Sequence, residues 1–399
     1  MKIGIYNVMP ELRINKDCMG GFGLGFGDHL HLFGKIIGAF KRKNVYIPDL
    51  DLGYLAAIHR DRGDEVEYTE TANGSYDKVY IHASLQGHFD ELKAADQLRA
   101  RGIQVCLIGF LPKFLPHLFS GYETLTDKIW PDKFPAWEYW PMERFSYYPS
   151  IKRKPVVPVL SSTGCKYNCS YCPYLACYGE WEARPPENVL AEINYMVKRF
   201  GVKGIIFRDP LFTADRNRVE EICRGIQGVD WACETRLENL DEPLIDMMGE
   251  SGCRAIHFGI ESESDEVLTL VNRSNTIFER QKHMVDYCDQ RNIKVNCFFV
   301  FGLPGETEAT AEDTIRKAIR LNPNVAEFFV AQPYPGTRLY KQVEDKLFDL
   351  PVTSYDGFTE LFEHPNFPRG RREQICTDAY RRFYFRPQYI RSFLRRNIR

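Results

Sequence analysis

Three cysteines lie close together in the middle of the chain. Cys165, Cys169 and Cys172 form a C-x₃-C-x₂-C run, and Cys177 follows them. Thiolates are soft ligands that suit zinc or an iron–sulfur cluster. Three of them leave one iron of a [4Fe–4S] cluster without a protein ligand, and that iron can bind a substrate. A structural zinc site with Cys177 as fourth ligand is the alternative, but the spacing favours the cluster.

The composition is that of an ordinary globular protein. The 399 residues are 44% hydrophobic and 27% charged, which excludes a disordered or collagen-like chain. The net charge of −2 provides no overall field for nucleic acid or a membrane surface. No apolar run reaches the roughly 18 residues of a membrane span, and the N-terminus lacks the pattern of a signal peptide. We therefore expect a cytoplasmic protein without a membrane span or a nucleic-acid partner.

Alternating strand and helix patterns divide the chain into four parts and predict an α/β fold. Residues 1–135 predict a doubly wound α/β domain, and residues 136–155 a linker rich in proline and aromatic residues. Residues 156–340 contain six strand–helix units, which suit a partial (β/α)₆ barrel or a large open parallel sheet. The expected strands are residues 156–160, 204–207, 230–235, 254–259, 295–301 and 327–331, and the helix expected after the second strand is residues 216–225. Residues 341–399 predict a helical C-terminal region with aromatic residues inside and arginines outside; binding of nucleic acid or anionic lipid is the alternative for this basic tail.

The cysteine run follows the first strand of the third part. In a barrel or an open parallel sheet, functional residues gather at the carboxyl ends of the strands. The cysteines therefore belong to the expected active face. The later strands of this part are each followed by polar residues or glycines that would reach the same face: Asp209, Glu234, Arg236, Glu261, Ser262, Gly302, Gly305 and Tyr334.

The cysteine run resembles that of the radical S-adenosylmethionine (radical SAM) superfamily. It has the superfamily spacing, with the aromatic residue Tyr171 before the third cysteine, and the resemblance extends from about Val156 to Tyr340. It implies that Cys165, Cys169 and Cys172 hold a [4Fe–4S] cluster whose open iron binds SAM. Reduction by a flavodoxin- or ferredoxin-type electron donor would then cleave SAM to methionine and a 5′-deoxyadenosyl radical, which abstracts hydrogen from a small-molecule substrate.

The same resemblance implies roles for the residues at the strand ends. Asp209 would contact the SAM amino group, and Arg236 would pair with its carboxylate as a bidentate fork. The cofactor-binding set is completed by the cluster neighbour, the ribose-contacting segment and the adenine-side loop: Tyr171, Glu261, Ser262, Gly302 and Gly305. Glu234 and Tyr334 would face the substrate. For Glu234 and Arg236, an ordinary surface ion pair is the alternative.

Two further segments narrow the resemblance to the branch with an N-terminal cobalamin-binding domain. They are Gly-Leu-Pro-Gly-Glu-Thr at 302–307 and Pro-Tyr-Pro-Gly-Thr at 333–337. The resemblance places a cobalamin-binding-like, Rossmann-type domain before Trp130 and makes cobalamin a possible cofactor. Ser84 and Gly109 lie where the cobalamin tail usually passes. Two departures oppose cobalamin: the Asp-x-His-x-x-Gly motif is absent, and the usual Gly-Gly is Gly109-Phe110.

The sequence thus predicts a radical SAM enzyme of small-molecule biosynthesis and leaves its reaction open. Cobalamin-dependent C-methylation is slightly favoured. Cobalamin-independent dehydration, cyclisation or rearrangement of a natural-product intermediate is the alternative. A tRNA-modifying transferase is less favoured, because only Cys18 and Cys106 precede the cluster run, whereas the methylthiolating relatives carry an N-terminal cysteine trio.

Overall fold

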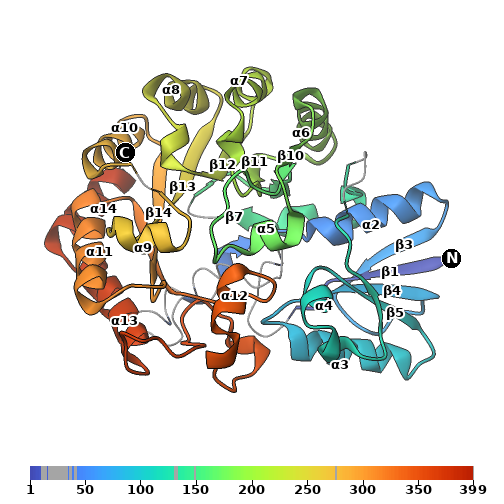
Figure 1. Cartoon of the computed structure of the whole chain (residues 1–399). Coiled ribbons are helices and arrows are strands. Elements are labelled where there is room, and N and C mark those ends of the chain that lie inside the picture. Colours follow the sequence, from blue (N-terminus) through green and yellow to red (C-terminus); the bar gives the residue numbers. More distant parts are fainter. Residues whose placement is uncertain are drawn as a thin grey trace.

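The fold was analysed in a computed structural model of the chain. The structure describes residues 1–9, 16, 35, 38–39, 43–129, 134–147, 150–274 and 276–398. Figure 1 shows two parts side by side, an N-terminal α/β part in blue and teal and a larger part from green to red. The α/β class with two parallel sheets confirms the predicted fold class.

The N-terminal part is built on a parallel sheet with strand order β3-β1-β4-β5-β6. Its strands are β1 (Lys2–Tyr6), β3 (Glu65–Thr69), β4 (Lys78–His82), β5 (Gln104–Ile108) and β6 (Glu123–Leu125). The helices α2 (Leu50–Asp61) and α3 (His88–Arg99) connect them. Asp49 caps α2 by accepting a hydrogen bond from the backbone of Leu52 at 3.0 Å. The central strands are buried on both faces, as the doubly wound pattern requires.

The second part contains a six-stranded parallel sheet with strand order β15-β14-β13-β12-β11-β8. This order places consecutive strands side by side, as in a partial barrel. The strands are β8 (Val156–Val159), β11 (Gly204–Phe207), β12 (Asp230–Thr235), β13 (Cys253–Glu261), β14 (Lys294–Phe301) and β15 (Val325–Val330). All six were predicted, and β11 and β12 have the predicted bounds.

Helices between these strands cover the outer face of the sheet (Figure 1). They are α6 (Pro186–Phe200), α7 (Arg216–Gly225), α8 (Glu242–Glu250), α9 (Asp265–Leu270), α10 (Phe278–Gln290) and α11 (Glu308–Leu321). Thr307 caps α11 with a reciprocal pair of hydrogen bonds to Thr310. The side chains between sheet and helices form one extended hydrophobic core.

The segment between the two parts is packed against both. Its described residues include short 3₁₀ helices at Trp137–Tyr139 and Met142–Arg144, and Trp137 and Phe145 are fully buried. The short strand β7 (Ser146–Tyr147) pairs with β2 (Val45–Tyr46). Val45 and Tyr147 of this pair line the cavity described below.

The C-terminal region adds helices to the side of the second sheet near β15. It contains α12 (Arg338–Val343), α13 (Arg371–Tyr384) and α14 (Pro387–Ile398). Tyr380 and Phe383 of α13 are buried against Phe328 of β15. The aromatic residues of this basic helix therefore face inward, as the packing interpretation predicted. In the described part of the chain, no helix is both long enough and apolar enough to cross a membrane.

Candidate active site

The cysteine run lies in a loop at the carboxyl end of the first barrel strand. The loop follows β9 (Ser162–Thr163) and ends at α5 (Pro173–Tyr178), for which Cys172 is the N-cap. Gly164 starts the loop with φ +65°, and a Cβ there would lie 2.1 Å from the carbonyl oxygen of Glu180. Only glycine fits this close approach, so the loop enters the cysteine run in one fixed direction.

The three cysteines of the run are half-buried and influence one another electrostatically. Burial, with a smaller contribution from the neighbouring thiols, raises the pKa of Cys165 and Cys172. Positive charge at this point, which metal ions supply, favours the thiolate form. Among the described residues, no three His, Cys, Asp or Glu side chains converge as ligands of a single ion. Thiolates that bind different irons of one cluster do not need to converge in that way.

Cys177 belongs to a different environment from the other three cysteines. It is 6% exposed and packs in the hydrophobic core of the N-terminal part, together with Phe110 and Leu111. Its thiol therefore behaves as a small buried apolar group. This placement removes the support for Cys177 as the fourth ligand of a zinc site, and it leaves a set of three thiols.

A cavity of about 370 Å³ lies inside the partial barrel and reaches the cysteine loop. Tyr171 and Cys172 line its mouth, while Val45 and Tyr147 line its opposite end. The lining includes the first residues of β14 and β15, so the cavity runs along the length of these strands. Its volume lies within the range of small-molecule sites. Glu234 and Tyr334, the two predicted substrate-facing residues, both line it.

Tyr171 is held beside Glu261 and Arg273 at the mouth of the cavity. Arg273 lies 3.7 Å from Glu261 and also donates to the carbonyl oxygen of Gly259. Burial raises the pKa of Glu261, while Arg273 and the Tyr171 hydroxyl favour its charged form. Glu261 has φ +66°, which is rare for a residue with a side chain and frequent at functional sites.

Arg236 lies against the cysteine loop. Its guanidinium stacks on the ring of Tyr167, with 3.9 Å between the guanidinium carbon and the ring centroid. It also donates to Glu238 at 3.3 Å and to the carbonyl oxygen of Ser274. The arginine is 6% exposed, so its contact with Glu238 is not an ordinary surface ion pair. Its predicted pairing with the SAM carboxylate stays a prediction.

Asp209 has partners within the protein that the sequence did not indicate. It is fully buried and accepts hydrogen bonds from the Ser161 backbone at 2.8 Å and from the hydroxyls of Ser161 and Ser162 at 2.6 and 2.5 Å. These contacts fix the strand end that leads into the cysteine loop. Asp209 does not line the cavity, and its predicted contact with SAM stays a prediction.

Ser262 and the glycine loop after β14 also make contacts within the protein. Ser262 is fully buried, with its hydroxyl 3.3 Å from that of Thr314 on α11. Gly302 has φ +86°, and its N–H donates to the buried Glu306. Gly305 has φ +82°, with the side chain of Leu270 where a Cβ would project. Their predicted contacts with ribose and adenine stay predictions.

Sequence reasoning missed several polar residues that line the cavity. His257, Asn296 and Glu327 lie within strands, and Arg208 and Gln332 follow the ends of β11 and β15. The signal was present, because Asn296 and Glu327 each interrupt an otherwise apolar strand. In a barrel strand that is buried on both faces, a polar residue at such a position points to a lined cavity.

The place where the resemblance puts the cobalamin tail is filled by the protein's own side chains. The hydroxyl of Ser84 donates to Glu91 at 2.5 Å. A Cβ on Gly109 would lie 2.6 Å from the ring of His82. Phe110 is 3% exposed and packs edge-on against Tyr178 of α5, with 4.9 Å between ring centroids.

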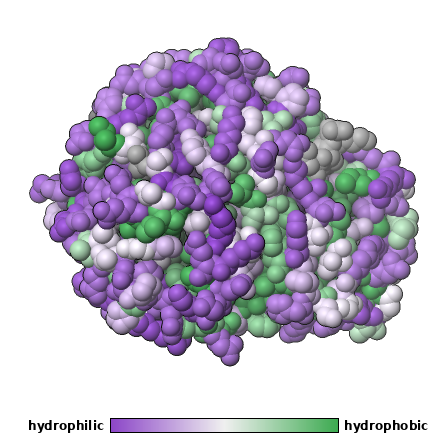
Figure 2. Space-filling view, in the orientation of Figure 1, coloured by the Kyte–Doolittle hydropathy of each residue, from purple (hydrophilic) through white to green (hydrophobic). Residues whose placement is uncertain are grey.

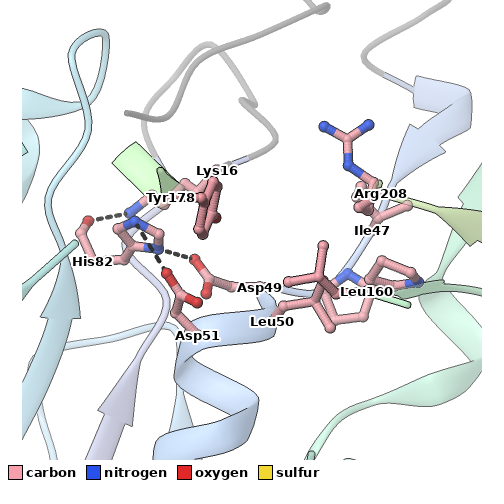
Figure 3. A pocket seen from close by; sticks show the side chains of 11 residues that line it. Lys16, Ile47, Asp49, Leu50, Asp51, His82, Leu160, Tyr178 and Arg208 are labelled. Atoms are coloured by element: carbon pink, nitrogen blue, oxygen red, sulfur yellow. Dashed lines mark hydrogen bonds and ion pairs between the residues drawn. The ribbon is translucent and has the colours of Figure 1, made fainter. Parts of the chain in front are cut away.

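The space beside these residues is small (Figure 3). Lys16 donates to the carbonyl oxygen of His82 at 2.9 Å, and the His82 ring lies 2.7 Å from Asp49. The remaining cavity measures about 20 Å³, which is room for about one water molecule. Figure 2 shows hydrophobic residues along the boundary between the two parts, over α4 (Leu111–Phe114) and α5. The described residues beside His82 leave only this small space, and cobalamin stays a candidate cofactor.

Comparison with known families identifies the second part of the chain. Residues 159–318 match the model of the radical SAM superfamily. Residues 159–318 therefore form a radical SAM domain. The three half-buried thiols beside an open cavity fit the [4Fe–4S] cluster and SAM that such a domain implies. Cys165, Cys169 and Cys172 would hold the cluster, and the residues around the mouth of the cavity would hold SAM.

Among curated proteins, the chain is 28% identical over 263 residues to an uncharacterized methyltransferase of Pyrococcus horikoshii. It is 27% identical over 270 residues to the anaerobic magnesium-protoporphyrin IX monomethyl ester cyclase of Rubrivivax gelatinosus. These matches cover 64% and 66% of this chain but only 56% and 47% of the relatives. The chain thus spans about half the length of these relatives.

Among solved structures, the fold is similar to that of the radical SAM methyltransferase TsrM from Kitasatospora setae, with a TM-score of 0.61 and 16% identity. That match covers 86% of this chain and 76% of TsrM. The cobalamin-dependent radical SAM enzyme OxsB matches with a TM-score of 0.56 and 12% identity, over 86% of this chain and 55% of OxsB. Both similarities include the N-terminal part, which therefore has the fold of the cobalamin-binding branch.

Proposed function

We propose that this protein is a radical SAM enzyme that abstracts a hydrogen atom from a small molecule bound in the barrel cavity. The observation that carries the proposal is that Cys172 and Tyr171 line the same 370 Å³ cavity as Glu234 and Tyr334. A radical generated beside the cysteine loop would meet its substrate without crossing solvent. Exclusion of water matters because a primary carbon radical attacks most C–H bonds.

When bound, the cluster and SAM supply a 5′-deoxyadenosyl radical, formed with methionine when one electron from a flavodoxin- or ferredoxin-type donor breaks the carbon–sulfur bond. The chain's own residues would orient the cysteine loop and shield the radical from water. Gly164 and the Asp209 network fix the entry to the cysteine loop. Tyr171, Glu261 and Arg273 brace its exit. Hydrogen transfer from a substrate carbon gives 5′-deoxyadenosine and a substrate radical.

The geometry favours a reaction that ends without cobalamin, as an elimination, a cyclisation or a rearrangement. Phe110 packed on Tyr178 and the small space beside His82 support this outcome. Cobalamin-dependent C-methylation is the second candidate. It is supported by the names of the relatives and by the similarity in fold to TsrM and OxsB.

One experiment tests the proposal and separates its two outcomes. The protein is reconstituted anaerobically with iron and sulfide, supplied with hydroxocobalamin, reduced and incubated with methyl-labelled SAM. Formation of 5′-deoxyadenosine supports the radical SAM proposal, and its absence contradicts it. A corrin absorption band together with S-adenosylhomocysteine would establish the methylase and exclude the cobalamin-free reaction.

A further inference from the structure

Two buried side-chain amides line the barrel cavity with hydrogen-bond acceptors. Asn296 on β14 donates its amide N–H to Glu327 on β15 at 2.8 Å. This contact fixes the orientation of the amide, so the carbonyl oxygen Oδ1 of Asn296 is on the other side. Asn296 is 9% exposed, and its Oδ1 accepts no hydrogen bond from the described residues. A buried acceptor that lacks a hydrogen-bond donor costs free energy unless a ligand donates to it.

A second acceptor of the same kind lies at the carboxyl end of β15. Gln332 donates its amide to the carbonyl oxygens of Val330 at 3.2 Å and Thr359 at 2.9 Å. Its own Oε1, in a side chain that is 5% exposed, has no donor among the described residues. Both amides line the same cavity, so the wall presents two buried acceptors to whatever occupies it.

The charges around these acceptors favour a cation. Four carboxylates line the cavity, from Glu234, Glu261, Glu327 and Asp356, together with the basic side chains of Arg208 and Lys294. Glu234 lies 3.7 Å from Arg208, and Glu261 lies 3.7 Å from Arg273, so these two carboxylates already have cationic partners. The lining adds the carboxylates of Glu327 and Asp356 to the one amine of Lys294. Burial and the neighbouring Lys152 lower the pKa of Lys294, which weakens this residue as a fixed positive charge.

Aromatic rings form the remaining wall beside Asn296 and Glu327. Tyr147 stacks on His257 with 6.2 Å between centroids, His257 meets Phe298 edge-on at 5.9 Å, and Phe298 lies 6.1 Å from Phe329. Ring faces attract cations, and the attraction increases when water is excluded. The amide of Asn296, the carboxylate of Glu327 and these aromatic rings thus line the same stretch of β13, β14 and β15.

We propose that the substrate carries a protonated amine, and that this amine binds between the Glu327 carboxylate and Oδ1 of Asn296, with an apolar or aromatic body that extends toward the cysteine loop. A primary ammonium group has three N–H donors and matches this set. A carboxylate at the same place would face Glu327 and an acceptor oxygen, which disfavours it. The inference rests on the proposed function only in that the cavity holds the substrate.

Three probes with one body and different head groups test the proposal on the reconstituted protein with SAM bound. They are 2-phenylethylamine, 2-phenylethanol and 3-phenylpropionic acid, and their dissociation constants are measured by ligand-observed NMR. The amine is expected to bind at least about tenfold more tightly than the acid, the difference that one charge-assisted hydrogen bond makes. Equal affinities, or tighter binding of the acid, would overturn the proposal.

Variants locate the amine. Glu327→Gln keeps the size of the side chain and should weaken amine binding by about tenfold or more while leaving alcohol binding nearly unchanged. Asn296→Leu, which removes the amide acceptor Oδ1, should weaken amine binding as well. The exposed Glu363→Gln is the control and should change nothing. Amine binding that is unaffected in both cavity variants would overturn the assignment, provided that their melting temperatures match the wild type.

The binding measurements do not depend on the radical chemistry. Wild-type protein without a substrate is assayed in parallel for slow 5′-deoxyadenosine formation under reducing conditions. If SAM is cleaved but the amine shows no preference, the substrate assignment fails and the proposed function stands. If the amine binds as expected but SAM is not cleaved, the proposed function fails and the amine site stands.

Discussion

Replacement of Asp209 by alanine should strongly destabilise the protein, because this residue ties the second barrel strand to the start of the cysteine loop. Its carboxylate accepts three hydrogen bonds, from the backbone and hydroxyl of Ser161 and from the hydroxyl of Ser162. Both serines are fully buried, so water cannot replace the lost acceptor. Arg218, which donates to the carbonyl oxygen of Ser161 at 2.6 Å, also loses a nearby counter-charge.

The expected loss in the free energy of unfolding follows from these contacts. Three hydrogen bonds to a charged acceptor, at about 1.5–3 kcal/mol each, give roughly 4–9 kcal/mol, from which the cost of burying the carboxylate is subtracted. Removal of one partner from a buried charged network typically costs about 3–5 kcal/mol, and we expect this value for Asp209→Ala. Asp209→Asn keeps one acceptor oxygen and the volume, so we expect about 1–2 kcal/mol.

Urea unfolding of the cluster-free protein, followed by circular dichroism, measures both values without any contribution from SAM. Asp313→Ala, at a surface ion pair with Arg316, is the control and should change the free energy of unfolding by less than about 0.5 kcal/mol. A loss below about 1 kcal/mol in Asp209→Ala would refute the positioning role. A stable Asp209→Ala variant that no longer binds SAM would instead support the cofactor contact predicted from the sequence.

Three other perturbations have expected outcomes. Gly164→Ala should prevent cluster assembly, because its Cβ would meet the Glu180 carbonyl oxygen. Gly201→Ala, at a left-handed position with no neighbour within 4 Å, should leave cluster assembly intact and cost only about 1 kcal/mol in urea unfolding; equal effects on cluster assembly would contradict this. Arg236→Ala should raise the dissociation constant of SAM by about 30- to 150-fold in equilibrium dialysis, the equivalent of 2–3 kcal/mol, and unchanged affinity would place the arginine elsewhere in the mechanism. Burial raises the pKa of Glu306 to about 8 from 4.5. As the pH rises, the unfolded chain therefore loses this proton first, and the free energy of unfolding should fall between about pH 5 and pH 8 by up to about 1.4 kcal/mol per pH unit. Glu306→Gln should flatten that slope, and an unchanged slope would argue against a neutral Glu306.

Strand and helix positions in the second part could be predicted from sequence because each has a local cause. The apolar run at 204–207 and the amphipathic pattern at 216–225 gave elements with the observed bounds. The positions of the cysteines could be predicted for the same reason, since their spacing is local. The bounds of the four predicted parts stay predictions, because the contacts of the segment at 134–147 extend into both sheets.

Partners that come from distant parts of the chain could not be predicted. Asp209 is joined to Ser161, 48 residues away, through strand pairing that no local pattern records. The environment of Cys177 depends on how α5 meets the N-terminal part, which only tertiary packing sets. Asn296 and Glu327 are 31 residues apart. Their pairing follows from the register of two parallel strands, whereas their polarity within apolar strands was visible in advance.

The central claim, that three cysteines and not four hold a cluster that cleaves SAM, is tested most directly by counting 5′-deoxyadenosine. Wild-type protein and the Cys165→Ala, Cys169→Ala, Cys172→Ala and Cys177→Ala variants are reconstituted anaerobically, reduced with dithionite and incubated with SAM. The account predicts that 5′-deoxyadenosine forms in the wild type and in Cys177→Ala and is absent from the other three. Loss of the product in Cys177→Ala with a native melting temperature, or its formation in any of the other three variants, would contradict the account.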